Sequence, residues 1–517
     1  MRESVIKLFV AAPLAFLFII ASISGSPAQN PKKKWSPIIP KTWDDEAVAS
    51  IELPLPYARY SPTHVSSDYY YSIPVRPIYK DYAIYRPDKE PPGYMEWLKR
   101  QEPQIVAFDT SKLATEDEWA KAGENVFDAP IAYDAGTILA VVRDPLWYEQ
   151  VRVPVTKDGV FPYGRYVIRE KGKVEVGIGA CSNCHTRVMP DGGIIKGAQG
   201  NFPLDRSTAF EIRLESGKAK DGKEFLERNL YLERGAFSAP WLQSADPYAR
   251  RKQMSLEEII SSYEAIPPGV LSRQRSSVDH PPRVPDLIGV KEIRYLDSSG
   301  LVRHRGIGDL MRYAALNQGA DALSRFGDFV PGAEDFKTLP EPTTQSRYSD
   351  EQLYALALYI YSLKPPQNPN RFDALAARGK KIFESEGCAV CHTPPLYTNN
   401  RLTPAKGFEV TEEHRTKFDV MMTSVSTDSS LTLNTRRGTG YYKVPSLRGV
   451  WYRGPFEHNG SVATLEDWFD PRRLKDDYVP TGFRGYGVKT RAVKGHAFGL
   501  DLSVENRKAL VAFLKTL

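Results

Sequence analysis

Three stretches of the chain place apolar and small residues at the spacing of a helix, and each carries a start or stop signal. Residues 348–366 begin with the cap-like Ser349 and end at two prolines, which cannot continue a helix. Residues 372–387 keep a four-residue spacing of apolar and small positions. Residues 503–517 begin with Ser503 and gather their apolar residues on one face. The pattern therefore predicts three helices.

A glycine followed four residues later by a phenylalanine marks one of these helices and predicts a fourth. Gly379 and Phe383 lie on the second predicted helix, and Gly123 and Phe127 lie in residues 116–127. Because glycine has no side chain, another helix can approach the backbone closely at that point. We therefore expect each of these helices to be crossed by a partner helix.

The remaining pattern is mostly irregular. Residues 163–179 alternate apolar and polar positions around Lys171 and Gly172, which predicts a β-hairpin. Residues 37–56 lack a helical or strand period for most of their length, so we expect the Pro- and Tyr-rich segment 29–101 to wrap the first domain as extended chain. The predicted fold class is mainly α, with much irregular coil and a small β-hairpin insertion.

Composition limits the function classes. The chain has 517 residues, enough for roughly two to four domains at about 100–200 residues each. With 41% apolar and 26% charged residues it can bury a core, and nothing indicates wholesale disorder. The net charge of +6 is small for this length, and no basic stripe is interleaved with aromatic residues. We expect no nucleic-acid partner.

The N-terminus is typical of an export signal. Arg2 and Lys7 supply positive charge before the apolar run from Leu8 to Gly25, and residues 26–28 offer a small-x-small cleavage site. The alternative is an uncleaved membrane anchor, because the run is at the lower limit of a spanning helix. Either way we expect a periplasmic or secreted protein, with membrane contact only if the segment is not cleaved.

All four cysteines lie in two Cys-x-x-Cys-His motifs. Cys181 and Cys184 precede His185, and Cys388 and Cys391 precede His392. Two disulfides are the simplest alternative in an oxidising compartment, and zinc would need a fourth ligand. Thioether attachment of haem explains the whole motif, because two thiols three residues apart can bond the porphyrin while the adjacent imidazole binds the iron.

We therefore predict two covalently bound c-type haems, with His185 and His392 as the proximal iron ligands and the four cysteines as thioether donors. The predicted domains are a signal peptide or anchor at 1–28, an extended segment at 29–101, a first cytochrome c-like domain with insertions at 102–366, and a second at 367–517. The helices 116–127 and 348–366 would open and close the first domain. The helices 372–387 and 503–517 would open and close the second.

The C-terminal part resembles a known family. Residues 441–471 are similar to the Val-Pro-Ser/Thr-Leu-Arg, Pro-Tyr/Phe and His-Asp/Asn-Gly-Ser signature of the bacterial di-haem cytochrome c peroxidase superfamily. Residues 494–503 resemble the end of its larger branch, which includes the rubber oxygenases. The resemblance implies that His496 is the distal ligand of the second haem. His458, at the His-Asp/Asn-Gly-Ser position, is the alternative.

Two departures from the family restrict what the resemblance implies. The window after His458 lacks the axial methionine of the peroxidases, which argues against a His/Met pair and leaves Met421 and Met422 as outside alternatives. The segment after the second motif is also much shorter than in rubber oxygenases, so polymer cleavage is not implied.

For the first haem, residues 276–321 are the predicted distal wall. They hold His280, His304, Arg305, Asn317 and Gln318, and one of the imidazole or guanidinium groups could polarise a bound oxygen species. The alternative is that these side chains cap helices or join surface salt bridges.

Two functions remain open. The first is an exported di-haem oxidoreductase of peroxidase or oxygenase type, with electron transfer between the haems. The alternative is a non-catalytic electron-transfer cytochrome, whose irons would both carry two strong ligands. The expected partners are a redox protein or small electron donor, together with peroxide, oxygen or an organic substrate in the catalytic case.

Overall fold

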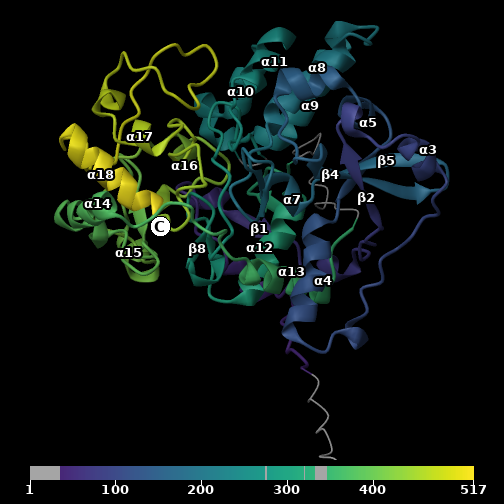
Figure 1. Cartoon of the computed structure of the whole chain (residues 1–517), viewed down its shortest axis with the longest axis horizontal. Coiled ribbons are helices and arrows are strands. Elements are labelled where there is room, and N and C mark those ends of the chain that lie inside the picture. The colour runs from purple at the N-terminus through teal and green to yellow at the C-terminus, as the bar shows by residue number, and fades with distance from the viewer. Residues whose placement is uncertain (1–34, 274–275, 320, 332–345) are drawn as a thin grey trace, which may run out of the picture.

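The computed structural model describes residues 35–273, 276–319, 321–331 and 346–517 (Figure 1). The predicted signal or anchor at 1–28 lies outside these residues. No helix in the described ranges is both long and apolar enough to cross a membrane.

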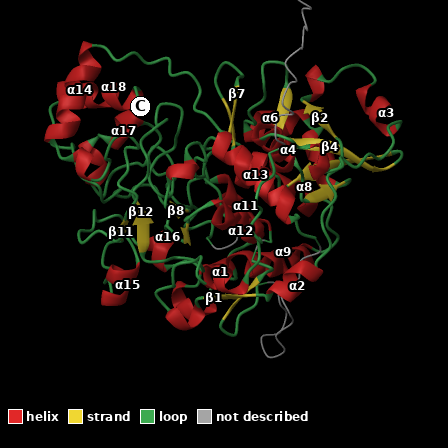
Figure 2. Cartoon of the chain, turned by 90° about the horizontal axis from the view of Figure 1, so that it is seen from below, coloured by secondary structure: helices red, strands yellow, loops and turns green. Residues whose placement is uncertain are grey.

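Two pairs of crossing helices organise the molecule. Helix α4 (Glu116–Asp128) packs on α13 (Asp350–Ser362), and α14 (Ala374–Ser385) packs on α18 (Val504–Lys515). Figures 1 and 2 show the α14–α18 pair on one side of the molecule and the α4–α13 pair near the other. The four helices predicted from the sequence are thus confirmed.

The glycine steps explain why the helices cross where they do. A β-carbon at Gly123 would collide with the carbonyl of Ala355, and one at Gly379 would collide with the carbonyl of Ala509. One turn further on, Phe127 contacts Tyr359 and Phe383 contacts Phe513, with ring centroids 5.2 and 5.3 Å apart. The predicted close crossings are therefore confirmed in both pairs, as are the caps at the starts of α13 and α18.

The predicted hairpin is confirmed, but it belongs to a larger sheet. Strands β4 (Val160–Glu170) and β5 (Lys173–Ile178) pair around the turn at Lys171 and Gly172, where Gly172 has φ +86°. Strands β2 (Asp81–Tyr85) and β3 (Ala132–Asp134) add to its two edges, giving the order β2-β4-β5-β3. From β5 the chain passes directly into α7 (Cys181–Cys184) at the first cysteine motif.

The N-terminal segment is more structured than predicted. It contains α1 (Asp45–Ala49), within the stretch expected to be extended, because Asp44 accepts a hydrogen bond from the amide of Ala47 and caps the helix. Its strand β2 joins the sheet, and Trp43 and Tyr70 are buried in the core beside α4 and α13. The segment therefore completes the core around the first helix pair. Its other elements are β1 (Pro62–His64), α2 (Ser67–Ser72) and α3 (Tyr94–Lys99).

A helical region separates the first cysteine motif from α13. Its longest members are α8 (Leu204–Ser216) and α9 (Gly222–Phe237), which belong to a separate apolar core with α11 (Leu256–Glu264).

The remaining α-helices of the described chain are α5 (Thr137–Val142), α6 (Pro145–Val151), α10 (Pro247–Arg251), α12 (Ile307–Gln318), α15 (Glu412–Lys417), α16 (Ser430–Leu433) and α17 (Leu465–Trp468).

Short two-stranded ladders complete the structure. They pair β1 with β10 (Ser324–Phe326), β6 (Thr186–Val188) with β7 (Ile194–Lys196), β8 (Tyr295–Leu296) with β9 (Val302–Arg303), and β11 (Leu402–Pro404) with β12 (Tyr441–Lys443). The observed fold is thus a mixture of helices and several small sheets rather than mainly α with one hairpin.

In addition to the two Cys-x-x-Cys-His motifs, a second sequence repeat relates two loop regions that are 160 residues apart. Val284-Pro285-Asp286-Leu287 matches Val444-Pro445-Ser446-Leu447, and the glycine and valine that follow also match. The backbone repeats as well, because Asp297 and Glu457 have φ +66° and +70° and each carbonyl accepts a hydrogen bond from the glycine three residues later. The loops that follow the two cysteine motifs are therefore built on one plan.

Candidate cofactor sites

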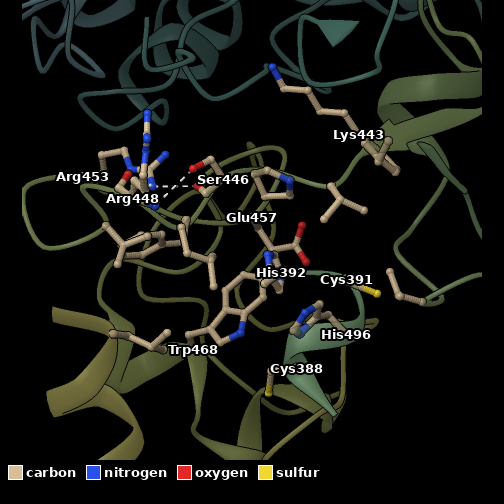
Figure 3. Close-up of a pocket in the computed structure, with 18 of the residues that line it drawn as sticks. Cys388, Cys391, His392, Lys443, Ser446, Arg448, Arg453, Glu457, Trp468 and His496 are labelled. Carbon is tan, nitrogen blue, oxygen red and sulfur yellow. Dashed lines mark hydrogen bonds between the residues drawn. The ribbon is translucent and has the colours of Figure 1, made fainter. Parts of the chain in front are cut away.

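A deep cavity lies at the second cysteine motif. Cys388, Cys391 and His392 line it, together with Trp468 and His496 (Figure 3). Its walls are largely apolar, which suits a flat hydrophobic cofactor. The apolar lining includes Phe383, Leu396, Leu447, Val450, Phe456, Leu465, Phe469, Leu510 and Leu514.

The two histidines of this cavity face one another. The ring centroids of His392 and His496 are 6.2 Å apart. Two imidazoles that bind one metal ion at about 2.0 Å each place their ring centroids roughly 6 Å apart. The residues present therefore fit an iron held between His392 and His496, with two thiols nearby for covalent attachment.

The histidines of both Cys-x-x-Cys-His motifs are oriented in the same way. The Nδ1 atom of His392 lies 3.1 Å from the carbonyl oxygen of Tyr397, and Nδ1 of His185 lies 3.1 Å from that of Pro285. Such a bond fixes the tautomer and leaves Nε2 for a metal. Burial lowers the pKa of each imidazole to about 4, so both are neutral, as a metal ligand must be. None of the four cysteines forms a disulfide.

His496 is held by a buried arginine. Arg473 donates to the carbonyl oxygens of Val493, Gly495 and His496 at 2.7, 3.0 and 2.7 Å, and its own side chain is fully buried. His496 itself has φ +45°, a conformation that non-glycine residues seldom adopt. Arg473 thus fixes a strained loop that presents the imidazole to the cavity.

His458 lines the same cavity but is engaged on both sides. Its Nδ1 lies 2.7 Å from Glu457 and its Nε2 lies 3.2 Å from Asp428. Burial opposes the charge, but Asp428 and then Glu457 raise the pKa of His458 to about 9. A protonated imidazole between two carboxylates is not a metal ligand. Of the two predicted alternatives, the structure brings His496 opposite His392.

The two methionines predicted as outside alternatives for the distal ligand are placed differently from His496. Met421 lines the cavity, where its sulfur accepts a weak hydrogen bond from Asn399, and the side chain of Met422 is 71% exposed.

The first cysteine motif borders a smaller cavity with a different lining. His185 and Cys184 face it, whereas Cys181 packs against the core of the α4–α13 pair. In the described part of the chain, the lining includes no other histidine and no methionine. Polar side chains are placed there instead, namely Arg273, Arg283, Asp297, Tyr313 and Arg437.

Tyr313 and Asp297 form a hydrogen-bonded pair in this lining. The hydroxyl of Tyr313 donates to Oδ2 of Asp297 at 3.1 Å. Asp297 has φ +66°, so its side chain is held in the cavity wall by a strained backbone. A phenol bonded to a carboxylate can accept and return a proton.

The four residues predicted for the distal wall lie elsewhere. Both ring nitrogens of His304 are engaged at 2.6 Å, one with the carbonyl of Ile293 and one with the hydroxyl of Tyr361. Arg305, whose side chain is partly exposed, pairs with the buried Asp309.

His280 lies near Asp428 and His458 instead, and burial lowers its pKa against the opposing effect of Asp279 and Asp428. Gln318 ends α12 with its side-chain amide nitrogen buried and unpaired. Neither of them lines the cavity at His185, and nor do His304 and Arg305.

Asp297 and Tyr313, which line the cavity at His185, both belong to the predicted segment 276–321. The signal that could have found Asp297 is the 160-residue repeat, which aligns it with Glu457 in the second cavity. Tyr313 has no equivalent in the repeat, and only the fold brings it to Asp297.

One wall is shared by the two cavities. Arg283 and Pro285 line both, and the carbonyl of Pro285 is the one that orients His185. The two sites are thus separated by a single segment of chain.

Comparison with known proteins gives distant matches. No family model matches the chain. Over 155 residues it is 26% identical to the cytochrome-c peroxidase IdrP2 of Denitromonas iodatirespirans, covering 27% of this chain and 38% of the relative. Over 162 residues it is 27% identical to IdrP1 of the same organism, covering 28% and 40%. The chain thus spans about two-fifths of the length of the curated relatives it matches.

Two solved structures also align. A chain of Kuenenia stuttgartiensis hydrazine synthase, pressurised with xenon, aligns with TM-score 0.29 and 18% identity over 49% of this chain and 79% of that chain. A MauG-like protein associated with microbial copper homeostasis aligns with TM-score 0.22 and 17% identity over 32% and 56%. The sequence matches show weak homology to cytochrome-c peroxidases, and no particular branch of that superfamily is singled out.

Proposed function

We propose that the chain is an exported di-haem c-type oxidoreductase in which the C-terminal site relays electrons and the N-terminal site reacts with peroxide or oxygen. The observation that carries the proposal is the difference in lining. The second cavity presents two facing histidines, whereas the first presents one histidine opposite polar side chains. Two strong ligands favour a relay, and a single strong ligand leaves a position for a substrate.

The distant homology to cytochrome-c peroxidases supports an oxidoreductase of this kind. A haem at each motif supplies an iron that gains or loses one electron. Electrons would come from a redox protein or small donor outside the cytoplasm.

The protein's own contribution at the first site is proton handling and charge. Tyr313 and Asp297 hold a proton between them at the cavity wall, and Arg273 adds a positive charge to the lining, whereas the charge of Arg437 is offset by Glu52 and Asp321. Reduction of one peroxide to two waters consumes two electrons and two protons. The Tyr313–Asp297 pair would deliver those protons to the reacting oxygen atoms.

The test is peroxide-dependent oxidation of a reduced donor by the mature di-haem protein. We expect Asp297→Asn and Tyr313→Phe to lower kcat/KM for peroxide by about 100-fold or more, because a positioned acid or base contributes that much. Both variants should retain two haems by mass and by haemochrome absorbance.

Arg305→Gln is the matched control, because Arg305 lies in the same segment but outside the cavity. Its activity should stay within about twofold of wild type, as for most surface substitutions. Full activity in Asp297→Asn and Tyr313→Phe would remove the proposed proton route. Absence of any peroxide or oxygen turnover in the wild type would favour the electron-transfer cytochrome.

A further inference from the structure

Two cations occupy equivalent positions in the 160-residue repeat. Arg283 and Lys443 each directly precede the Val-Pro pair. The backbone of each residue is also hydrogen-bonded to the other copy of the repeat. The amide of Arg283 donates to the carbonyl of His458 at 2.8 Å, and the amide of Lys443 donates to the carbonyl of Ser298 at 3.1 Å. Ser298 and His458 are themselves 160 residues apart. The wall between the cavities is therefore a pseudo-symmetric contact to which each copy of the repeat contributes one cation.

Both cations reach the cavities. Arg283 lines the first and the second, and Lys443 lines the second. Figure 3 shows Lys443 well away from Cys388, with Arg453 and Arg448 also on the side of the cavity opposite that cysteine. The positive charge thus gathers at the edge of the second cavity far from a thioether donor.

Two of these cations have carboxylate partners, because Arg453 pairs with Asp286 at 3.6 Å and Arg448 pairs with Glu292 at 2.7 Å. In the described part of the chain, Nε of Arg283 is buried without a hydrogen-bond partner, and Nζ of Lys443 donates to the carbonyl of Tyr295 at 3.3 Å. Within the described ranges, no ion pair joins Arg283 or Lys443 to a carboxylate. Burial and then repulsion from Arg453 lower the pKa of Arg283 to about 10. Burial, opposed by Asp297 and reinforced by Arg283 and Arg453, lowers the pKa of Lys443 to about 8. Buried charge of this kind is costly unless an anion compensates it.

We propose that Arg283 and Lys443 bind the carboxylate groups of the two tetrapyrroles and form a cationic bridge between the sites. The inference rests on the proposed function, since it needs a haem at each motif. Haem carries its two carboxylates on one edge, and a guanidinium matches a carboxylate in a planar, bidentate geometry. Arg283 would serve carboxylates of both cofactors, and Lys443 those of the second.

A bridge of this kind raises both reduction potentials. Each iron takes up one electron on reduction, so the cofactor becomes more negative by one charge. A buried cation beside it stabilises the reduced form, and the low local dielectric strengthens the effect. Because Arg283 faces both cavities, it would link the two potentials.

The test is a spectroelectrochemical titration of the di-haem protein, with dithionite as reductant, in wild type and in Arg283→Gln, Arg283→Lys and Lys443→Gln. We expect Arg283→Gln to lower the midpoint potentials of both haems and Lys443→Gln to lower mainly that of the second. Arg283→Lys keeps the charge and should restore most of the wild-type values. The matched control is Lys417→Gln, which removes an exposed lysine of α15.

Potentials in Arg283→Gln and Lys443→Gln that move no further than in Lys417→Gln would overturn the bridge, while two bound haems would leave the proposed function intact. A wild-type protein without two haems would instead overturn the proposed function. If Arg283→Gln does not accumulate in folded form, Lys443→Gln decides the question, because the second potential must then fall in that variant.

Discussion

The two cysteine motifs share a scaffold and differ in what closes it. Each motif is followed by the same Val-Pro-x-Leu-x-Gly-Val segment and lies beside a glycine-stepped helix crossing. At the second site, a loop held by Arg473 brings His496 opposite His392. At the first site no such loop is present among the described lining residues, and Asp297 and Tyr313 face the cavity instead. Under the proposed function, the loops would decide reactivity, and the shared scaffold would place only the histidine of each motif.

The helix crossing beside each cysteine motif can be disrupted by the same substitution, glycine to alanine. Alanine at Gly123 or Gly379 should destabilise the protein by about 3 kcal/mol, because the new β-carbon meets the backbone of the partner helix and overpacking of this kind costs that much or more. Helix propensity alone would favour alanine by about 1 kcal/mol. Chemical unfolding of the haem-loaded protein measures the effect.

Gly222→Ala at the start of α9 is the control, since nothing lies near its β-carbon position, and it should be neutral or slightly stabilising. Equal stability of all three variants would show that the crossings do not depend on glycine.

A charged imidazole distinguishes the second site from the first. His458 is protonated at the second site, and the repeat places the uncharged Ser298 at the equivalent position of the first. The pKa of His458 is raised from 6.5 to about 9 in the folded protein. Its stabilising contribution is therefore fully present below about pH 6.5 and is lost as the pH rises through about 9, to a total of up to about 3 kcal/mol.

Unfolding free energies between pH 6.5 and 9 should fall more steeply in wild type than in His458→Gln. Identical slopes in the two proteins would mean that His458 is neutral when folded.

A substitution of Arg473 tests whether the loop that it holds is needed to keep His496 opposite His392. Arg473→Met removes three hydrogen bonds to loop carbonyls, each worth about 1.5–3 kcal/mol when the donor is charged. We expect the second haem to become a mixture of six-coordinate and five-coordinate spectra, with the first haem unchanged. The exposed neighbour Arg472 provides the control, and Arg472→Met should keep the wild-type spectrum. A wild-type spectrum in Arg473→Met would show that the loop holds without it.

The sequence predicted the parts of this structure that depend on local signals. The capped helices, the glycine steps and the hairpin at Gly172 were readable from short patterns, and the family resemblance of residues 494–503 indicated His496. The role of His304 was not, because its partners, the carbonyl of Ile293 and the hydroxyl of Tyr361, come from other elements.

Long-range pairing accounts for the other differences. Strand β2 lies some 75 residues before β4 in the chain, and no local pattern indicates that they pair. The cap at Asp44 was a local signal for α1, although a helix of five residues gives too short a period to detect. The equivalence of Arg283 and Lys443 could also have been predicted from the sequence, because aligning the chain with itself at an offset of 160 residues pairs them.

Carbon monoxide binding to the fully reduced protein measures the difference between the two sites most directly. With the haem content determined on the same sample, one carbon monoxide per two haems is expected, and His496→Ala should raise this to two. Binding of none, or of two by the wild type, would contradict the assignment of one open and one closed iron.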